Sequence, residues 1–170
     1  NCIPKDVSLF KKTPDLESII DDSDIIYIGG GNTKSMLAVW REWQLDKFLK
    51  KAYRAGTIMS GVSAGAICWF QNGITDSWSS NLKVMTCMNL IKGCCCPHYD
   101  EEPERKPTVK KLLNANKFNN IFAVDGGAAL PIKNEAIYKS IVFKKNKKTY
   151  LVCKDKGEII EKSYRKIILI

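Results

Sequence analysis

The most informative stretch of this sequence for chemistry is Gly-Val-Ser-Ala-Gly at residues 61–65. It follows a short run, Thr57–Ser60, that predicts a strand, and it precedes an apolar run, Ala66–Gln71, that predicts a helix. A serine at the apex of such a turn presents its hydroxyl, and the flanking glycines are needed because Cβ atoms would crowd the turn. The start of the following helix also stabilises negative charge. We therefore predict that Ser63 is a nucleophile.

A serine nucleophile needs a base, which is normally a histidine. The chain has one histidine, His98, in a polar segment after Pro97 that predicts a loop. Loops at strand ends are where α/β proteins place their functional residues. His98 is therefore the candidate base if a histidine activates Ser63.

The base in turn needs an orienting carboxylate. Asp125 is our first choice, because it leaves an apolar strand and enters a glycine turn. Asp76 is the second choice. The remaining candidates lie close to His98 in the sequence, and turn capping or solvation is the alternative interpretation for every one of them: Asp100, Glu101, Glu102 and Glu104.

Acyl transfer also needs two backbone donors for the oxyanion. The amide of Ala64 follows the nucleophile, and the second donor could come from Gly30 or Gly31 in the loop Gly29-Gly30-Gly31. A phosphate loop is the rival interpretation of this loop. The spacing fits neither of the two glycine patterns that bind nucleotides, so we favour the oxyanion hole.

The elements around these residues predict an α/β fold with a mostly parallel sheet covered by helices on both faces. Strands, helices and glycine turns alternate in the first half of the chain. Shorter strands follow in the second half and predict an antiparallel extension at the sheet edge. The predicted helices are Leu16–Asp22, one helix running from Met36 to Ala52 and stopped by Gly56, and Ala66–Gln71; the predicted strands are Ile25–Ile28, Thr57–Ser60, Phe118–Val124, Ala128–Ile132, Ala136–Phe143, Thr149–Cys153 and Glu158–Ile160.

Length and composition indicate one globular domain over residues 1–170, with 45% hydrophobic and 26% charged residues. No apolar run approaches the ~20 residues of a membrane span, and the first residues resemble no signal peptide. The net charge is +9, and the densest basic run, Lys144–Lys148, is expected to be a solvated hairpin tip. The charge permits nucleic acid as a partner, but no nucleic-acid motif is present, so we expect none.

The seven cysteines are odd in number, which favours reduced thiols and a cytoplasmic setting over a disulfide framework. Cys94, Cys95 and Cys96 lie close to His98 and raise the question of a metal site. Adjacent residues of an extended chain point to opposite faces, and no second cluster completes a tetrahedron. We therefore expect no metal and no other cofactor.

Four motifs in order link the chain to a known family: Ile-Gly-Gly-Gly-Asn-Thr at 28–33, Gly-Val-Ser-Ala-Gly-Ala at 61–66, Pro-His-Tyr-Asp at 97–100 and Asp-Gly-Gly-Ala-Ala-Leu at 125–130. Together they resemble peptidase E, the aspartyl dipeptidase (S51-type) family of serine peptidases, which is related to cyanophycinase. The resemblance covers roughly residues 24–162. It implies the flavodoxin-like fold of class I glutamine amidotransferases, which carry cysteine where this chain has Ser63.

The resemblance also implies roles. It makes Ser63 the nucleophile, His98 the base and Asp125 the acid, with Asp76 near another acidic position. Gly31 and Ala64 match the oxyanion donors. Asn32 and Arg105 match substrate-binding positions, and a guanidinium such as that of Arg105 can hold a carboxylate bidentately. The implied activity is release of an N-terminal aspartate from short peptides through an acyl-enzyme.

The chain departs from the family at its start, where relatives usually carry another strand and helix. We expect either an N-terminally truncated domain or a gap filled by Val7–Phe10 and a partner subunit, as in a homodimer. Two other functions stay open: a related hydrolase for β-aspartyl or ester substrates, and an inactive homologue that acts as a binding module.

Overall fold

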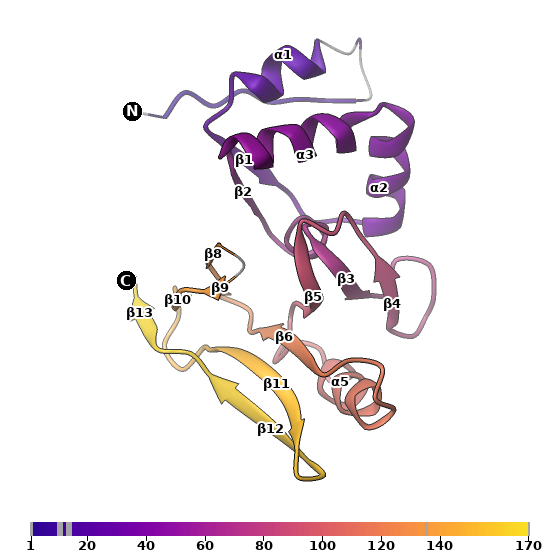
Figure 1. Cartoon of the computed structure of the whole chain (residues 1–170), viewed down its shortest axis with the longest axis vertical. Helices are drawn as coiled ribbons and strands as arrows, with labels where there is room; N and C mark the ends of the chain where they lie inside the picture. The colour runs from indigo at the N-terminus through magenta and orange to yellow at the C-terminus, as the bar shows by residue number, and fades with distance from the viewer. Residues whose placement is uncertain (1, 10–11, 13–14, 135, 170) are drawn as a thin grey trace.

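A computed structural model describes residues 2–9, 12, 15–134 and 136–169 of the chain. Strands β1 (Ile25–Ile28) and β2 (Ile58–Gly61) form a parallel pair, in register from Ile25 opposite Ile58 to Ile28 opposite Gly61. Both strands therefore end at the same edge, and the glycine loop and the Ser63 turn leave from that edge. Figure 1 shows this pair beside α3.

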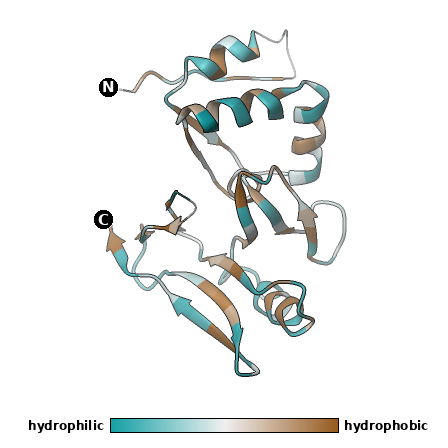
Figure 2. Cartoon of the chain, in the orientation of Figure 1, coloured by the Kyte–Doolittle hydropathy of each residue, from teal (hydrophilic) through white to brown (hydrophobic). Residues whose placement is uncertain are grey.

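Three helices build the N-terminal half around this pair: α1 (Leu16–Asp21), α2 (Thr33–Glu42) and α3 (Leu45–Ala55). Their apolar faces share one core with the strands, centred on Ile26, Leu37, Trp40 and Leu49. The hydrophilic residues of α3 appear in teal in Figure 2. Gly56 ends α3 with φ of 106°, as its position after the helix predicts.

The single helix predicted from Met36 to Ala52 is wrong, because the chain breaks between α2 and α3. Gln44 takes a left-handed φ of 56° at the break. In one straight helix, the side chains of Leu45 and Leu49 would be rotated by about one residue around the helix axis, away from the face that carries Leu37 and Trp40. The break turns the second apolar face back into the same core.

A six-stranded sheet forms the rest of the scaffold, in the order β12-β11-β6-β5-β3-β4. Its centre, β3 to β5 to β6, is parallel, and the outer pairs are antiparallel. The antiparallel C-terminal extension is thus as predicted. The strands are β3 (Phe70–Thr75), β4 (Lys83–Thr86), β5 (Ile91–Cys96), β6 (Asn120–Val124), β11 (Thr149–Asp155) and β12 (Glu158–Ser163).

The remaining elements are small. Helix α5 (Arg105–Asn114) packs against β6 and β11. Two minor sheets lie near the C-terminus in Figure 1. Their strands are β7 (Ala128–Ala129), β8 (Ile132–Lys133), β9 (Ala136–Ile137), β10 (Ser140–Val142) and β13 (Lys166–Ile168), so each of the predicted strands 128–132 and 136–143 is split in two.

The predicted helix Ala66–Gln71 is also wrong. Helix α4 spans only Ala64–Ile67, and the chain enters β3 at Phe70. Gly73 lets the strand pass close to this helix, since a Cβ at that position would lie 2.8 Å from the Ile67 side chain. Strand β3 therefore returns directly beneath the short helix.

Two further expectations can be compared with the fold. Lys144–Lys148 is not a hairpin tip, because it joins β10 to β11 and these strands belong to different sheets. In the segment 7–10, Phe10 lies outside the described residues, and Val7 to Leu9 form no strand. Within the described part of the chain, no helix is long and apolar enough to cross a membrane.

Candidate active site

Ser63 lies at the apex of the turn between β2 and α4, with φ of 55° and ψ of −116°. A serine rarely adopts this backbone conformation, which is typical of positions under functional constraint. The turn is held in place because the Val62 amide donates to the Ile28 carbonyl at 3.1 Å. Ser63 itself stays partly exposed. The turn therefore presents its hydroxyl as a nucleophile requires.

The two glycines that flank the turn are required by close backbone contacts. A Cβ on Gly65 would lie 2.1 Å from the Ile28 carbonyl oxygen. A Cβ on Gly61 would lie 2.3 Å from the Gly65 carbonyl oxygen. The neighbouring atoms are backbone and cannot swing aside, so the Ser63 turn packs tightly against the end of β1.

The loop Gly29-Gly30-Gly31 lies against Ser63. A Cβ on Gly30 would be 3.4 Å from the Ser63 Cβ and 4.0 Å from its Oγ. Gly31 follows with φ of 139°, and Ala64 is buried as the first residue of α4. The structure thus brings the predicted oxyanion loop to the predicted nucleophile.

The Asn32 side chain makes hydrogen bonds within the protein. Its Oδ1 accepts from the Ser35 amide at 3.0 Å and caps α2, and its Nδ2 donates to the Ser77 carbonyl at 2.6 Å. The Ser77 hydroxyl accepts from the Thr33 amide at 3.0 Å. These bonds tie the loop after β3 to the start of α2. In this structure Asn32 shapes the edge of the site and has its amide groups occupied.

His98 follows β5 directly and takes a left-handed φ of 52°. Its Nδ1 lies 2.6 Å from Oε2 of Glu101, and its side chain is 29% exposed. A carboxylate at Nδ1 favours the tautomer whose Nε2 can accept a proton. No hydrogen bond joins His98 to the Ser63 hydroxyl among the residues that the structure describes.

Neither predicted acid makes the hydrogen bond to His98. Asp125 is only 5% exposed, and its Oδ2 accepts from the Lys148 amide at 2.9 Å. Its Oδ1 is buried and has no hydrogen-bond partner in the described part of the chain. Burial raises the pKa of the Asp125 carboxyl, although the hydrogen bond from Lys148 opposes this. Asp76 is exposed in the loop after β3.

Glu101 is the acid whose pairing the sequence did not single out. It was one of several carboxylates near His98, and the usable signal is its spacing of three residues from the histidine. A single turn brings such side chains together, and the Glu101 amide donates to the His98 carbonyl at 3.1 Å. The Glu101 carboxylate also covers Gly126, where a Cβ would lie 1.9 Å from its Oε1.

Arg105 is not the free clamp expected for a substrate carboxylate. Its side chain is 4% exposed. Its Nε donates to Glu102 at 2.8 Å, and its Nη1 donates to the Ile74 carbonyl at 2.8 Å. The guanidinium therefore fastens the start of α5 to β3 in this structure.

The thiols form no metal site in the described residues, where no group of three or more His, Cys, Asp or Glu side chains could hold an ion. Cys94, Cys95 and Cys96 are all buried in β5. Burial raises the pKa of the Cys96 thiol to about 12. These cysteines therefore pack as neutral side chains.

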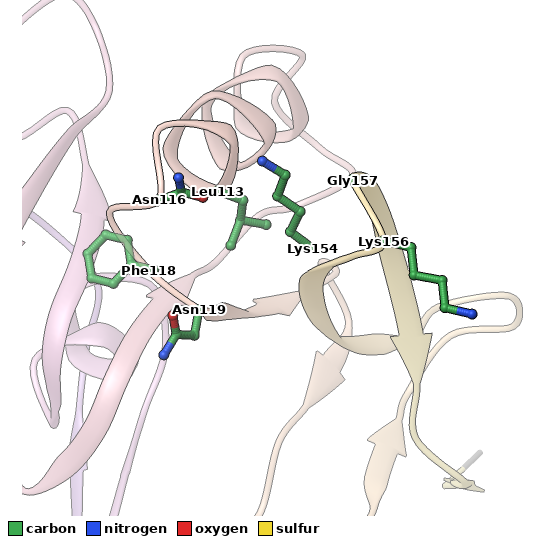
Figure 3. A pocket seen from close by; sticks show the side chains of 7 residues that line it. All are labelled: Leu113, Asn116, Phe118, Asn119, Lys154, Lys156 and Gly157. Atoms are coloured by element: carbon green, nitrogen blue, oxygen red, sulfur yellow. The ribbon is translucent and has the colours of Figure 1, made fainter.

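A cavity of about 430 Å³, seen from close by in Figure 3, has neither Ser63 nor His98 in its lining. It opens between the end of α5, the start of β6 and the turn from β11 to β12. In Figure 3, Lys154 extends toward α5, while Lys156 points away from it. The lining residues are Leu113, Asn116, Phe118, Asn119, Lys154, Lys156 and Gly157.

Comparison with known proteins gives this geometry its context. The model of peptidase family S51 matches residues 1–140. The chain belongs to peptidase family S51. This S51 chain is 39% identical over 162 residues to the uncharacterized peptidase YgaJ of Bacillus subtilis, covering 95% of this chain and 70% of YgaJ. It is 28% identical over 126 residues to peptidase E of Pasteurella multocida, covering 69% of this chain and 54% of that protein.

Two solved structures share the fold of this S51 chain. A candidate peptidase E protein from Listeria monocytogenes matches with a TM-score of 0.59 at 23% identity, over 76% of this chain and 65% of that one. A peptidase from an acI-B1 actinobacterium matches with a TM-score of 0.56 at 18% identity, over 90% of this chain and 61% of that one. The chain thus spans less than two thirds of either solved protein. The likeness confirms the predicted flavodoxin-like α/β fold.

Proposed function

We propose that this chain is a serine peptidase that releases an N-terminal aspartate from short peptides through an acyl-enzyme. The observation that carries the proposal is the strained, partly exposed Ser63 beside Gly30, in a chain of a peptidase family. Such a serine can attack a carbonyl that lies against the glycine loop. The proposal needs no cofactor.

The proposed reaction has two steps. The Ser63 Oγ attacks the carbonyl carbon of the aspartyl residue, and its proton passes to Nε2 of His98. The amides of Ala64 and Gly31 receive the oxyanion, and His98 returns the proton to the leaving amine. Water, deprotonated by His98, then cleaves the aspartyl ester on Ser63. Either Glu101 or Asp125 holds the positive charge on the ring.

Release of free aspartate from an Asp-Leu dipeptide tests the proposal. Ser63→Ala should lose at least about 1,000-fold in kcat with an unchanged Tm, because only the nucleophile is removed. Ser60→Ala, in the preceding strand, is the matched control. Turnover retained in Ser63→Ala would overturn the nucleophile assignment.

Substrate preference is tested separately. Asn-Leu and Glu-Leu should be cleaved far more slowly than Asp-Leu if a cation recognises the aspartate carboxylate. Arg105 matches the family position for this cation. Its Nε and Nη1 already donate to Glu102 and Ile74, so Nη2 would have to bind the substrate carboxylate. Equal rates on the three dipeptides would overturn the preference and favour a β-aspartyl or ester substrate. A serine-directed phosphonate that fails to label Ser63 would favour the binding module.

The cytoplasm is the proposed location, since all seven cysteines are free thiols in the structure. The proposed partners are peptides, with no nucleic acid and no membrane.

A further inference from the structure

The basic segment Lys144–Lys148 contains one lysine that reaches the His98 loop. The Lys147 ammonium forms an ion pair with Oδ2 of Asp100, which lies 47 residues away in the sequence. Both side chains are mostly covered, at 28% and 22% exposed. This pair is therefore better shielded from solvent than an ordinary surface ion pair.

Asp100 connects Lys147 to the turn after β6. Its Oδ1 accepts from the Gly126 amide at 2.8 Å. The Tyr99 amide donates to the Val124 carbonyl at 3.0 Å, one residue before Asp125. The segment that carries His98 is thus fastened at Tyr99 and at Asp100 to the end of β6 and the turn that follows it.

Lys147 faces several carboxylates at once. Besides Asp100, it is close enough to attract both Asp125 and Glu101. Burial opposes ionisation of Asp100, but the hydrogen bonds from Lys147 and Gly126 outweigh it and lower the pKa of this carboxyl. Lys106 also lies near this cluster, where it attracts Asp125 and is 5.2 Å from the Tyr99 ring centroid, and Glu161 accepts from the Tyr99 hydroxyl at 2.6 Å. Lys147 is the cation that these three acids share.

We infer that Lys147 is a positioning residue that holds the His98 loop against the turn after β6 by binding Asp100. This inference rests on the proposed function, in which His98 is the base. Lys147 touches neither the substrate nor the reacting atoms. It fixes where the His98–Glu101 pair lies, and its charge offsets the carboxylates around the ring.

The single histidine of the chain allows a test that does not depend on activity. In tag-free protein, every imidazole signal in a proton–nitrogen NMR titration belongs to His98. Lys147→Gln leaves the acids without their shared cation, so the midpoint of the His98 titration should move up by about 0.5 or more. Lys147→Arg should restore it. Lys145→Gln, an exposed lysine in the same segment, is the control and should move it little.

Kinetics supply the second readout. Lys147→Gln should lower kcat on Asp-Leu by about tenfold with little change in KM, because a small misplacement of a base is costly. Asp100→Asn should show a similar loss, and the double variant should lose no more than either single variant. The acidic limb of the pH–rate profile should move in the direction of the NMR titration.

The inference is overturned if the His98 titration of Lys147→Gln matches that of the Lys145→Gln control. It is also overturned if the losses from Lys147→Gln and Asp100→Asn are additive. Absence of turnover and of phosphonate labelling in the unaltered chain would instead refute the proposed function. The NMR titration still decides the role of Lys147 in that case.

Discussion

At the residue scale, the proposed chemistry depends on which carboxylate faces the His98 ring. Glu101 contacts Nδ1, while the buried Asp125 directs one oxygen to the Lys148 amide. A carboxylate at Nδ1 selects the tautomer and stabilises the imidazolium, so its loss damages catalysis much more than binding. The two acids therefore predict different outcomes when each is neutralised.

Glu101→Gln is expected to lower kcat by about 100-fold or more, since the amide favours the wrong tautomer. Asp125→Asn and Asp76→Asn should each lower kcat less than Glu101→Gln. Steady-state kinetics on Asp-Leu across the three variants measure the order. A greater loss in Asp125→Asn would return the orienting role to the acid that the family resemblance implies.

Asp125 also predicts a pH dependence of stability. Its pKa is raised in the folded chain, so the folded state holds this proton more tightly than the unfolded state. Ionisation of Asp125 therefore destabilises the fold. This loss of stability is absent below the unfolded pKa, grows as pH rises toward the folded pKa and is complete above it. Asp125→Asn should gain in Tm relative to the unaltered chain between pH 4 and pH 7, and differential scanning calorimetry would show it. If the Tm difference between Asp125→Asn and the unaltered chain became smaller as pH rises, the prediction would be wrong.

At the element scale, the site is made by two glycine turns that meet at the ends of β1 and β2. The parallel register brings Ile28 and Gly61 to the same level, so the two turns must leave side by side. Gly65 then passes so near Ile28 that only a glycine fits. The local contacts that hold the Ser63 turn are thus backbone contacts between neighbouring elements.

Gly65→Ala should destabilise the fold by about 1–3 kcal/mol or more, because its Cβ would meet the Ile28 carbonyl. Gly29→Ala is the matched control in the neighbouring loop, where a Cβ would meet nothing within 4 Å. Urea unfolding of both variants measures the difference. Equal stability of the two would show that the turn can relax away from β1.

At the scale of the whole molecule, one face of the β1–β2 pair is open. Ile25, Tyr27 and Ile58 are 58%, 65% and 59% exposed there, while the opposite face packs under the helices. Parallel strands are normally covered on both faces, so this apolar surface is unusual. It lies on the pair that carries the Ser63 turn.

The open face should bind an apolar fluorescent dye in the native state. Ile58→Lys should reduce that binding. Arg54→Lys, at a position that is already polar, is the control and should not reduce it. Dye titration with circular dichroism as a check on folding measures the effect. Unchanged dye binding in Ile58→Lys would show that the dye reports on another surface. The homodimer expected from the sequence stays a prediction, and sedimentation of the same variants tests whether it uses this face.

The sequence by itself determined the local features of this protein. The Ser63 turn, the end of α3 at Gly56 and the strand Ile25–Ile28 all follow from residue types within a few positions, because glycine permits tight and left-handed backbone and β-branched residues favour extended strands. The four ordered motifs pointed to peptidase family S51, and the family model agrees. The α/β class followed from alternation of strands and helices.

Tertiary structure alone decided the rest, because the remaining contacts join residues far apart in the chain. The hydrogen bonds that make Phe70–Thr75 a strand come from β4 and β5, so its apolar start resembled a helix. Arg105 was expected at the substrate but is held by Glu102 and Ile74. The pairing of His98 with Glu101 depends on a left-handed residue in the loop, and the reach of Lys147 to Asp100 depends on the path of the whole sheet. Composition and spacing do not determine which distant partner a side chain contacts, because these contacts form only when the core packs.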